Sequence, residues 1–237
     1  MRRWIAYLIA VVLSVGMCGC EMNTIYGSGL QVEEVHTISG TYNRVNVRNG
    51  LMLVIDPSMD KNMVVIKCDE ELLSNVSVRV FMNVLTVGYK NSFMFQTPLI
   101  TEVHIPDVSE VSTFDVRDSK MTADMIINRD SLMLSAVNSE VALGVQLRDF
   151  DIEAGNNSSI RLQGYAERCN LTLNKSSVME RRFSVAECNA VLVGSSLSLG
   201  CDERMVATLT EGSRLEYHGG CTADIIKSDD SEVVATK

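Results

Sequence analysis

The stretch Ser139-Glu140-Val141-Ala142-Leu143 contains the pattern that decides the fold: a serine, one variable residue and an apolar residue that opens an alternating run. This pattern occurs seven times between residue 111 and the C-terminus, as Ser119/Met121, Ser139/Val141, Ser158/Ile160, Ser176/Val178, Ser195/Leu197, Ser213/Leu215 and Ser231/Val233. Successive serines are 20, 19, 18, 19, 18 and 18 residues apart. A period this regular is typical of repeat architectures, whose units must stack because none buries its apolar side chains alone.

Alternating runs on both sides of each serine indicate the kind of repeat. Leu171-Thr172-Leu173 precedes Ser176, and Leu197-Ser198-Leu199 follows Ser195. Such two-residue periodicity, bounded by Gly, Asn, Asp and Ser, is typical of strands separated by turns. Eighteen to twenty residues are too few for two strands and a crossover helix, but they suffice for one coil of two or three short strands. The sequence therefore predicts an all-β fold: a right-handed parallel β-helix with about seven regular C-terminal coils and a less regular N-terminal β region.

Stacked coils place equivalent residues about 4.8 Å apart. The serines should then form a column at one corner, where their hydroxyls bond to each other and to the turn backbone. Their apolar followers should form an inward column, and the residues between them should point outward. The outward positions place Lys120 beside Glu140 and Arg214 beside Glu232, and such opposite charges favour the register by roughly 0.2–1 kcal/mol each.

The N-terminus has the features of a bacterial lipoprotein leader. Two arginines follow Met1, residues 4–17 are mostly apolar, and Gly19 precedes Cys20. The run is too short to span a bilayer as a helix. We expect residues 1–19 to be a lipoprotein signal peptide and residues 20–36 to hold the lipid attachment site, Cys20, and a tether. Cys18 fits less well because bulky Met17 precedes it, and an ordinary cleaved signal is the alternative. Several acyl chains would anchor the protein stably.

The remaining residues, 37–237, are expected to form one β-helical domain. Residues 111–237 hold the regular repeats. Residues 37–110 contain strands without the serine register, which fits either wider coils of the same β-helix or a sandwich-like cap on its N-terminal end. An uncapped coil end would be an unpaired sheet edge. Residues 70–74 are suited to a single helical turn.

Charge and composition exclude one class of partner. The chain has 21 Lys plus Arg against 30 Asp plus Glu, a formal net charge of −9. Without Arg2 and Arg3 the balance is 19 against 30, or −11. Nucleic acid is excluded as a partner because neutralising phosphates requires a basic surface. Aromatic residues make up only 5% of the chain, so neither base stacking nor a long aromatic sugar platform is expected.

Five cysteines lie beyond Cys20. Cys169 and Cys188 are 19 residues apart, and Cys201 and Cys221 are 20 apart, so each pair fits one position on neighbouring coils. Both a buried stack of thiols and a disulfide are open at that separation. No C-x-x-C spacing is present, and neither a metal site nor a cofactor site is predicted.

Several stretches resemble the head GIN domain family of auto-transporter adhesins. They are residues 42–55, 85–87, 103–106, 154–158 and 210–213, and the similarity extends over residues 38–235. Most repeats here keep only the last serine of the family's Ser-Gly-Ala-Ser phrase. The resemblance implies a β-helical fold, common to secreted and lipid-anchored proteins of Bacteroidetes, and a location in the cell envelope. It implies no catalytic motif.

A search for reactive residues leaves one enzymatic alternative. Asp115, Arg117 and Asp118 fall in one coil, with Asp149 and Asp151 in later coils, and two carboxylates could serve as acid and base in a polysaccharide hydrolase or lyase. The three histidines, His36, His104 and His218, are not spaced as ligands or nucleophile partners, and we expect them on the surface.

Three hypotheses of function follow. The first is an outer-membrane lipoprotein, periplasmic or surface-facing, that is a non-enzymatic adhesin or binding module for a glycan or a protein. The second is a carbohydrate-active enzyme on the same scaffold, and the third is a structural spacer in the envelope. No catalytic residue is assigned.

Overall fold

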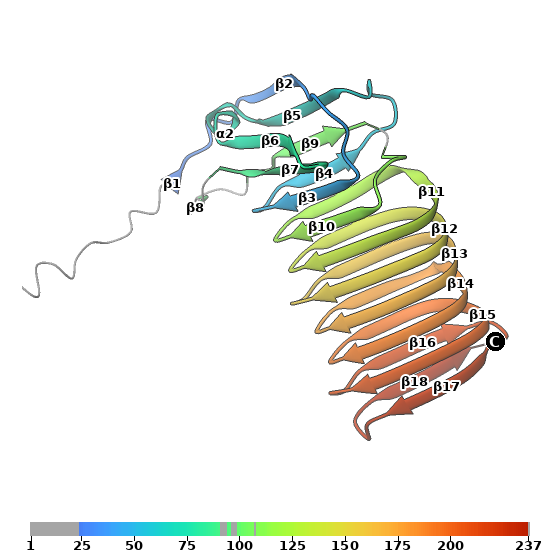
Figure 1. Cartoon of the computed structure of the whole chain (residues 1–237). Helices are drawn as coiled ribbons and strands as arrows, with labels where there is room; N and C mark the ends of the chain where they lie inside the picture. Colours follow the sequence, from blue (N-terminus) through green and yellow to red (C-terminus); the bar gives the residue numbers. More distant parts are fainter. Residues whose placement is uncertain (1–23, 91–93, 96–98, 107, 237) are drawn as a thin grey trace, which may run out of the picture.

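The chain folds as a β-solenoid. The computed structural model describes residues 24–90, 94–95, 99–106 and 108–236. It is 70% strand and 2% helix and makes about six turns, which are stacked in one direction (Figure 1). The predicted fold class is confirmed, and the predicted number of about seven coils is close.

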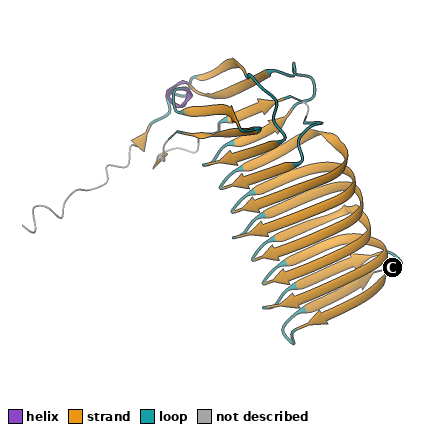
Figure 2. Ribbon diagram, in the orientation of Figure 1, coloured by secondary structure: helices purple, strands orange, loops and turns teal. Residues whose placement is uncertain are grey.

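Long strands form the regular part of the solenoid. They are β10 (Thr113–Arg117), β11 (Lys120–Val137), β12 (Glu140–Gly155), β13 (Ser159–Asn174), β14 (Ser177–Val193), β15 (Ser196–Thr210), β16 (Arg214–His218), β17 (Thr222–Lys227) and β18 (Glu232–Thr236). Neighbouring strands in this part pair in parallel. Each strand from β11 to β15 runs around most of a coil as one ribbon (Figure 2), where we predicted two or three separate short strands. The ladder continues around the coil, with small register shifts in three of the four pairings between these strands.

The serine pattern sets the register of the stack. Met121 pairs with Val141, and the series continues in register through Ile160, Val178, Leu197, Leu215 and Val233. The first six of these side chains are at most 1% exposed, which confirms the inward column. Val233 is only partly buried because β18 pairs with β16 alone.

Three phenylalanines fill the interior of the coils. Phe114, Phe150 and Phe183 are almost completely buried. The rings of Phe150 and Phe183, which come from β12 and β14, meet edge to face with their centroids 6.2 Å apart. This geometry adds about 0.5–1.5 kcal/mol to the effect of burial alone. It ties together coils that are not adjacent.

The N-terminal region continues the parallel stack for two more layers. Its strands are β3 (Arg44–Arg48), β4 (Met52–Ile55), β7 (Val84–Tyr89) and β9 (Glu102–Ile105). β3 and β4 pair in parallel with β10 and β11, and β7 and β9 pair in parallel with β3 and β4. The layer that comes first in sequence therefore lies between two that come later.

Antiparallel strands close this end. They are β2 (Gln31–Thr37), β5 (Met63–Asp69) and β6 (Val76–Phe81). β6 pairs with β7, β5 pairs with β9, and β2 pairs with β5, all antiparallel. We call β2, β5 and β6 the N-terminal cap. Residues 37–110 thus combine the two arrangements that the sequence left open.

Short elements complete the described chain. The helical turn α2 (Glu70–Leu73) lies at the expected position, with Asp69 as its N-cap. The short strands β1 (Thr24–Ile25) and β8 (Met94–Phe95) pair in parallel. β2 begins at Gln31, inside the range that we expected to be tether, because its backbone pairs with β5. Cys18 and Cys20 lie outside the described residues.

Candidate functional site

A groove runs along one corner of the solenoid, where the turns of successive coils lie above one another. Its volume is about 610 Å³. The residues that line it are Gly50, Leu51, Met52, Leu99, Ile100, Asp118, Ser119, Lys120, Asn138, Ser139, Glu140, Asn157 and Ser159. They come from four levels of the stack and from the segment before β9. The groove is therefore elongated along the axis on which the coils repeat.

The turn residues give the groove its polar floor. Asp118, Asn138 and Asn157 each come just before a serine of the column and have φ values of 49°, 50° and 65°. Asn and Asp tolerate this left-handed conformation better than other residues with a side chain. All three side chains are exposed, and Asn138 Nδ2 donates to Asp118 Oδ1 at 2.7 Å. The backbone requirement of the turn thus produces a column of amide and carboxylate groups.

The serine column lies directly beneath this floor. All seven serines are buried. The Ser139 hydroxyl donates to the carbonyl oxygen of Val137 at 2.7 Å and accepts from the backbone N–H of Ser119 at 3.3 Å. Similar bonds from a serine N–H to the next serine hydroxyl link Ser176 to Ser195 and Ser195 to Ser213. The hydroxyls bond to backbone at these positions, where we had expected some bonds between hydroxyls.

One wall of the groove is charged. Lys120 Nζ lies 3.0 Å from Glu140 Oε2, and Arg161 bonds to the other oxygen of Glu140. The hydrogen bond from Lys120 is the main cause of the lowered pKa of Glu140. The predicted outward pair Lys120/Glu140 is confirmed, as is Arg214/Glu232 at the far end of the solenoid. Exposed pairs of this kind stabilise a fold by at most about 1 kcal/mol each, so their main effect here is to fix the side chains.

The opposite wall is apolar. It consists of Leu99 and Ile100, with Met52 at its base. Ile100 is largely exposed, whereas Leu99 packs against the core. The groove thus offers hydrogen-bonding groups on its floor, charges on one side and a hydrocarbon surface on the other.

Comparison with known proteins places this fold. Residues 41–221 match the family model described as "Putative auto-transporter adhesin, head GIN domain". The chain belongs to this family. The match covers most of the chain and agrees with the resemblance noted in the sequence. A search of curated proteins finds no match for this head GIN domain protein.

Solved structures with the same fold come from Bacteroidetes. A putative adhesin of Bacteroides fragilis has a TM-score of 0.77 and 13% identity, covering 90% of this chain and 100% of its own. A putative adhesin of Parabacteroides distasonis has a TM-score of 0.68 and 14% identity, with 90% and 100% covered. A putative lipid binding protein of the same species has a TM-score of 0.66 and 13% identity, with 91% and 100% covered. At these identities the likeness shows the fold alone.

The carboxylates considered for catalysis are each bound to a partner in this head GIN domain. Asp115 lies 2.9 Å from Arg117 Nε, and Asp118 accepts from Asn138 on the groove floor. Asp151 accepts from Asn170 at 2.7 Å. Of these four Asp residues, only Asp118 lines the groove.

The fourth carboxylate is also paired. Asp149 bonds to Arg148 and Arg168. The hydrogen bond from Arg148 is the main cause of its lowered pKa. A general acid needs the opposite shift.

The histidines differ in exposure. His36 is on the surface beside Glu34. His104 is mostly buried, with 13% of its side chain exposed, and Nε2 lies 3.1 Å from Glu102. The expectation of a surface position was wrong for His104 because β9 pairs with both β4 and β5. His218 is half-buried in β16.

The five cysteines of the described chain are free thiols. Cys169 and Cys188 are register partners on β13 and β14, as their spacing suggested. Burial raises the pKa of Cys188 to about 12 and that of Cys68 to about 11. Cys201 is buried within hydrogen-bonding reach of the half-buried Cys221.

Two searches of the described residues concern metals and membranes. Among residues 24–90, 94–95, 99–106 and 108–236, no group of three or more His, Cys, Asp or Glu side chains is arranged to hold a metal ion. In the same part of the chain, no helix has the length and hydrophobicity needed to cross a bilayer.

The sequence analysis missed the column of turn residues that forms the groove floor. A signal was present, because Asp118, Asn138 and Asn157 each stand one position before a serine of the repeat. The apolar wall at Leu99 and Ile100 carried no such signal, since it comes from a segment outside the repeats.

Proposed function

We propose that this protein is a non-enzymatic, adhesin-like binding protein of the cell envelope, anchored through acyl chains on Cys20, whose corner groove binds a neutral polysaccharide. The groove carries the proposal: side chains of the same chemical kind recur on successive coils about 4.8 Å apart, the spacing of paired strands. A repeating polymer can make the same contact at each level.

The chemistry of the groove favours a polyol. Amide groups such as those of Asn138 and Asn157 both donate and accept hydrogen bonds, which matches sugar hydroxyls. The hydrocarbon of Ile100 and Leu99 suits the apolar face of a sugar ring. The negative charge of the mature chain, with 30 acidic against 19 basic residues, opposes an anionic polymer. A neutral glycan is therefore the ligand class.

Retention on polysaccharides tests this proposal. The full chain should be retained on one or more insoluble neutral glycans and should release no soluble fragments from them. Asn138→Ala and Asn157→Ala should each weaken binding about fivefold, the equivalent of one hydrogen bond of about 1 kcal/mol. Asn189→Ala is the matched control, because Asn189 is an exposed asparagine that bonds to Asn170 away from the groove. No retention on any neutral glycan would refute the ligand class, and release of fragments would refute the non-enzymatic role.

The anchor is tested separately. Cells that express the full chain should incorporate labelled fatty acid into it, and Cys20→Ala should abolish the label and release the protein from membranes. Cys18→Ala is the control and should leave both unchanged, because cleavage before Cys20 removes residue 18. Equal labelling of the Cys20→Ala variant would refute the assignment.

A further inference from the structure

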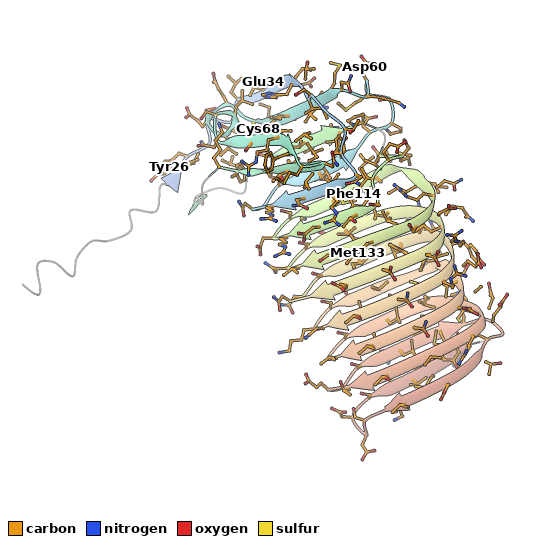
Figure 3. All side chains as sticks on the ribbon, viewed as in Figure 1. Tyr26, Glu34, Asp60, Cys68, Phe114 and Met133 are labelled. Carbon is orange, nitrogen blue, oxygen red and sulfur yellow. The ribbon has the colours of Figure 1, made fainter. Side chains whose placement is uncertain are left out.

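Three large apolar side chains are exposed at one edge of the N-terminal cap. Tyr26 is 65% exposed, Leu30 is 56% exposed and Ile100 is 65% exposed. Figure 3 shows Tyr26 at this edge, with Glu34 and Asp60 along the outer end of the cap. Single exposed apolar residues are ordinary, so what matters is whether these three lie together.

The two segments that carry these residues are in contact. Gly27 lies against Leu99, so closely that a Cβ on Gly27 would come 2.5 Å from Leu99 Cδ2. Ile100 lines a second groove together with Gln31 and Val32, the residues that follow Leu30. Tyr26, Leu30 and Ile100 therefore belong to one surface, which we call the tether-side patch.

A buried carboxylate fixes the segment between Tyr26 and Leu30. Asp69 is fully buried. It accepts hydrogen bonds from the backbone N–H groups of Ser28 at 3.1 Å and Gly29 at 2.8 Å, and from the Ser28 hydroxyl at 3.2 Å. Apolar side chains that are held in place before binding lose less entropy when they are covered. The patch is thus built into the fold, although its residues point to solvent.

The chain length between the patch and Cys20 limits what can cover it. Tyr26 is six positions after Cys20, and six extended residues span about 20 Å at most. An acyl-anchored chain would therefore hold the patch close to the membrane surface at all times. We propose that the tether-side patch rests on the lipid bilayer in which the Cys20 acyl chains are embedded, a proposal that depends on the anchor of the proposed function.

The charges around the patch specify the kind of lipid. Glu33, Glu34 and Glu102 are exposed close by, against one exposed base, Lys67. An anionic headgroup layer would be repelled, so the contact is with zwitterionic lipid and is made by apolar insertion. Tyrosine suits this position because its ring is apolar and its hydroxyl is polar. The contact should not weaken as salt is raised.

This arrangement orients the whole molecule. The coils from β12 to β18 extend away from the cap and from β1 (Figure 1). Ile100 lies where the tether-side patch meets the corner groove. With the patch on the membrane, the groove begins at the lipid surface and continues along the stack away from it. The anchor and the patch together would fix the direction of the solenoid, which one flexible attachment cannot do.

The mature chain allows a direct test because its only tryptophan, Trp4, lies in the predicted leader. Tyr26→Trp in the full, lipidated chain places a single fluorophore in the patch. On zwitterionic phosphatidylcholine vesicles that carry brominated acyl chains, its emission should shift to the blue and be quenched severalfold. Val191→Trp is the control, because Val191 is 46% exposed on β14, far along the solenoid, and should not be quenched. Adding Leu30→Asp and Ile100→Asp to Tyr26→Trp should reduce quenching to the level of this control.

The outcomes separate the patch from the anchor. Flotation with vesicles but no quenching at Tyr26→Trp would overturn the proposal and leave the anchor intact. Failure to float would refute the anchor and, with it, the seat of the patch. Quenching that requires anionic lipid and disappears in high salt would also overturn the proposal, because it would show an electrostatic contact.

Discussion

The backbone N–H of Ser139 donates a hydrogen bond to the hydroxyl of Ser158, which lies 3.3 Å away on the next coil. The Ser158 hydroxyl in turn donates to the carbonyl oxygen of Gly155 at 2.7 Å. One hydroxyl thus satisfies a turn amide on one coil and a turn carbonyl on another. The serine repeat in the sequence follows from this double role, which a residue without a hydroxyl cannot fill.

Ser158→Ala should therefore destabilise the fold. The substitution leaves the buried N–H of Ser139 without its partner, which costs about 1–3 kcal/mol. Chemical denaturation of the purified chain measures this loss. Ser159→Ala is the control, since that side chain lines the groove and should change the free energy of unfolding by less than about 0.5 kcal/mol. Equal effects of the two variants would contradict the role of the column.

Ile160→Asp should disrupt the middle of the stack. Ile160 is fully buried between Val141 and Val178, so the charge would have no partner and would cost roughly 3–5 kcal/mol. Domains have about 5–15 kcal/mol in total, so the variant should lose its cooperative melting transition or melt far below the wild type. Gln163→Asp places the same charge on the exposed side of the same strand and should melt close to the wild type. Normal melting of Ile160→Asp would contradict the inward assignment.

Gly164→Ala should be costly at a position where the strand bends. Gly164 has a φ of 109°, and a Cβ there would overlap the carbonyl oxygen of Val145 on the neighbouring coil. Strain of this kind costs about 1–3 kcal/mol. Gly155→Ala is matched, because a Cβ on Gly155 has nothing within 4 Å. Thermal melting should rank the variants with Gly155→Ala near the wild type; the reverse order would contradict this account of the bend.

The regular half of this fold could be predicted because its register is repeated in the sequence. Ser139, Val141 and Glu140 take a buried polar, an inward apolar and an outward charged position, and the same three choices recur on the other coils. Seven copies of a weak signal make a strong one. The cysteine spacing worked for the same reason, since Cys169 and Cys188 are register partners.

The N-terminal layers could not be predicted in the same way. β3 and β4 lie between strands that come later in the chain, and no repeat records this order. His104 alternates with apolar residues as a surface residue would, but β9 has a partner on each side and the side chain is covered. The apolar wall of the groove comes from the same region, so only half of the site had a sequence signal.

Reactivity of the thiols should follow their burial. Cys188 has a pKa of about 12 and is buried, whereas Cys221 is half-buried. With iodoacetamide near the ordinary thiol pKa of about 8.5, the native chain should be alkylated at Cys221 first, and Cys169, Cys188 and Cys201 should react only in denaturant. Peptide mass spectrometry measures each site. Rapid alkylation of Cys188 in the native chain, or resistance of Cys201 and Cys221 in denaturant without reductant, would contradict the free buried thiols.

Asp69 should make the stability of the N-terminal cap depend on pH. Burial raises the pKa of this carboxyl, but hydrogen bonds from Gly29, Ser28 and Glu71 outweigh it and bring the pKa below its ordinary value of 3.8. The stabilisation is therefore fully present above the ordinary pKa and is lost as the pH falls through the lower, folded-state pKa. Asp69→Asn should lower the denaturation midpoint at pH 7 and should have little further effect at the acid end, where the two curves converge. Asp60→Asn, on an exposed turn, should follow the wild type at every pH. A constant difference between wild type and Asp69→Asn from neutral to acid pH would show that the charge of Asp69 contributes nothing and that only its shape matters.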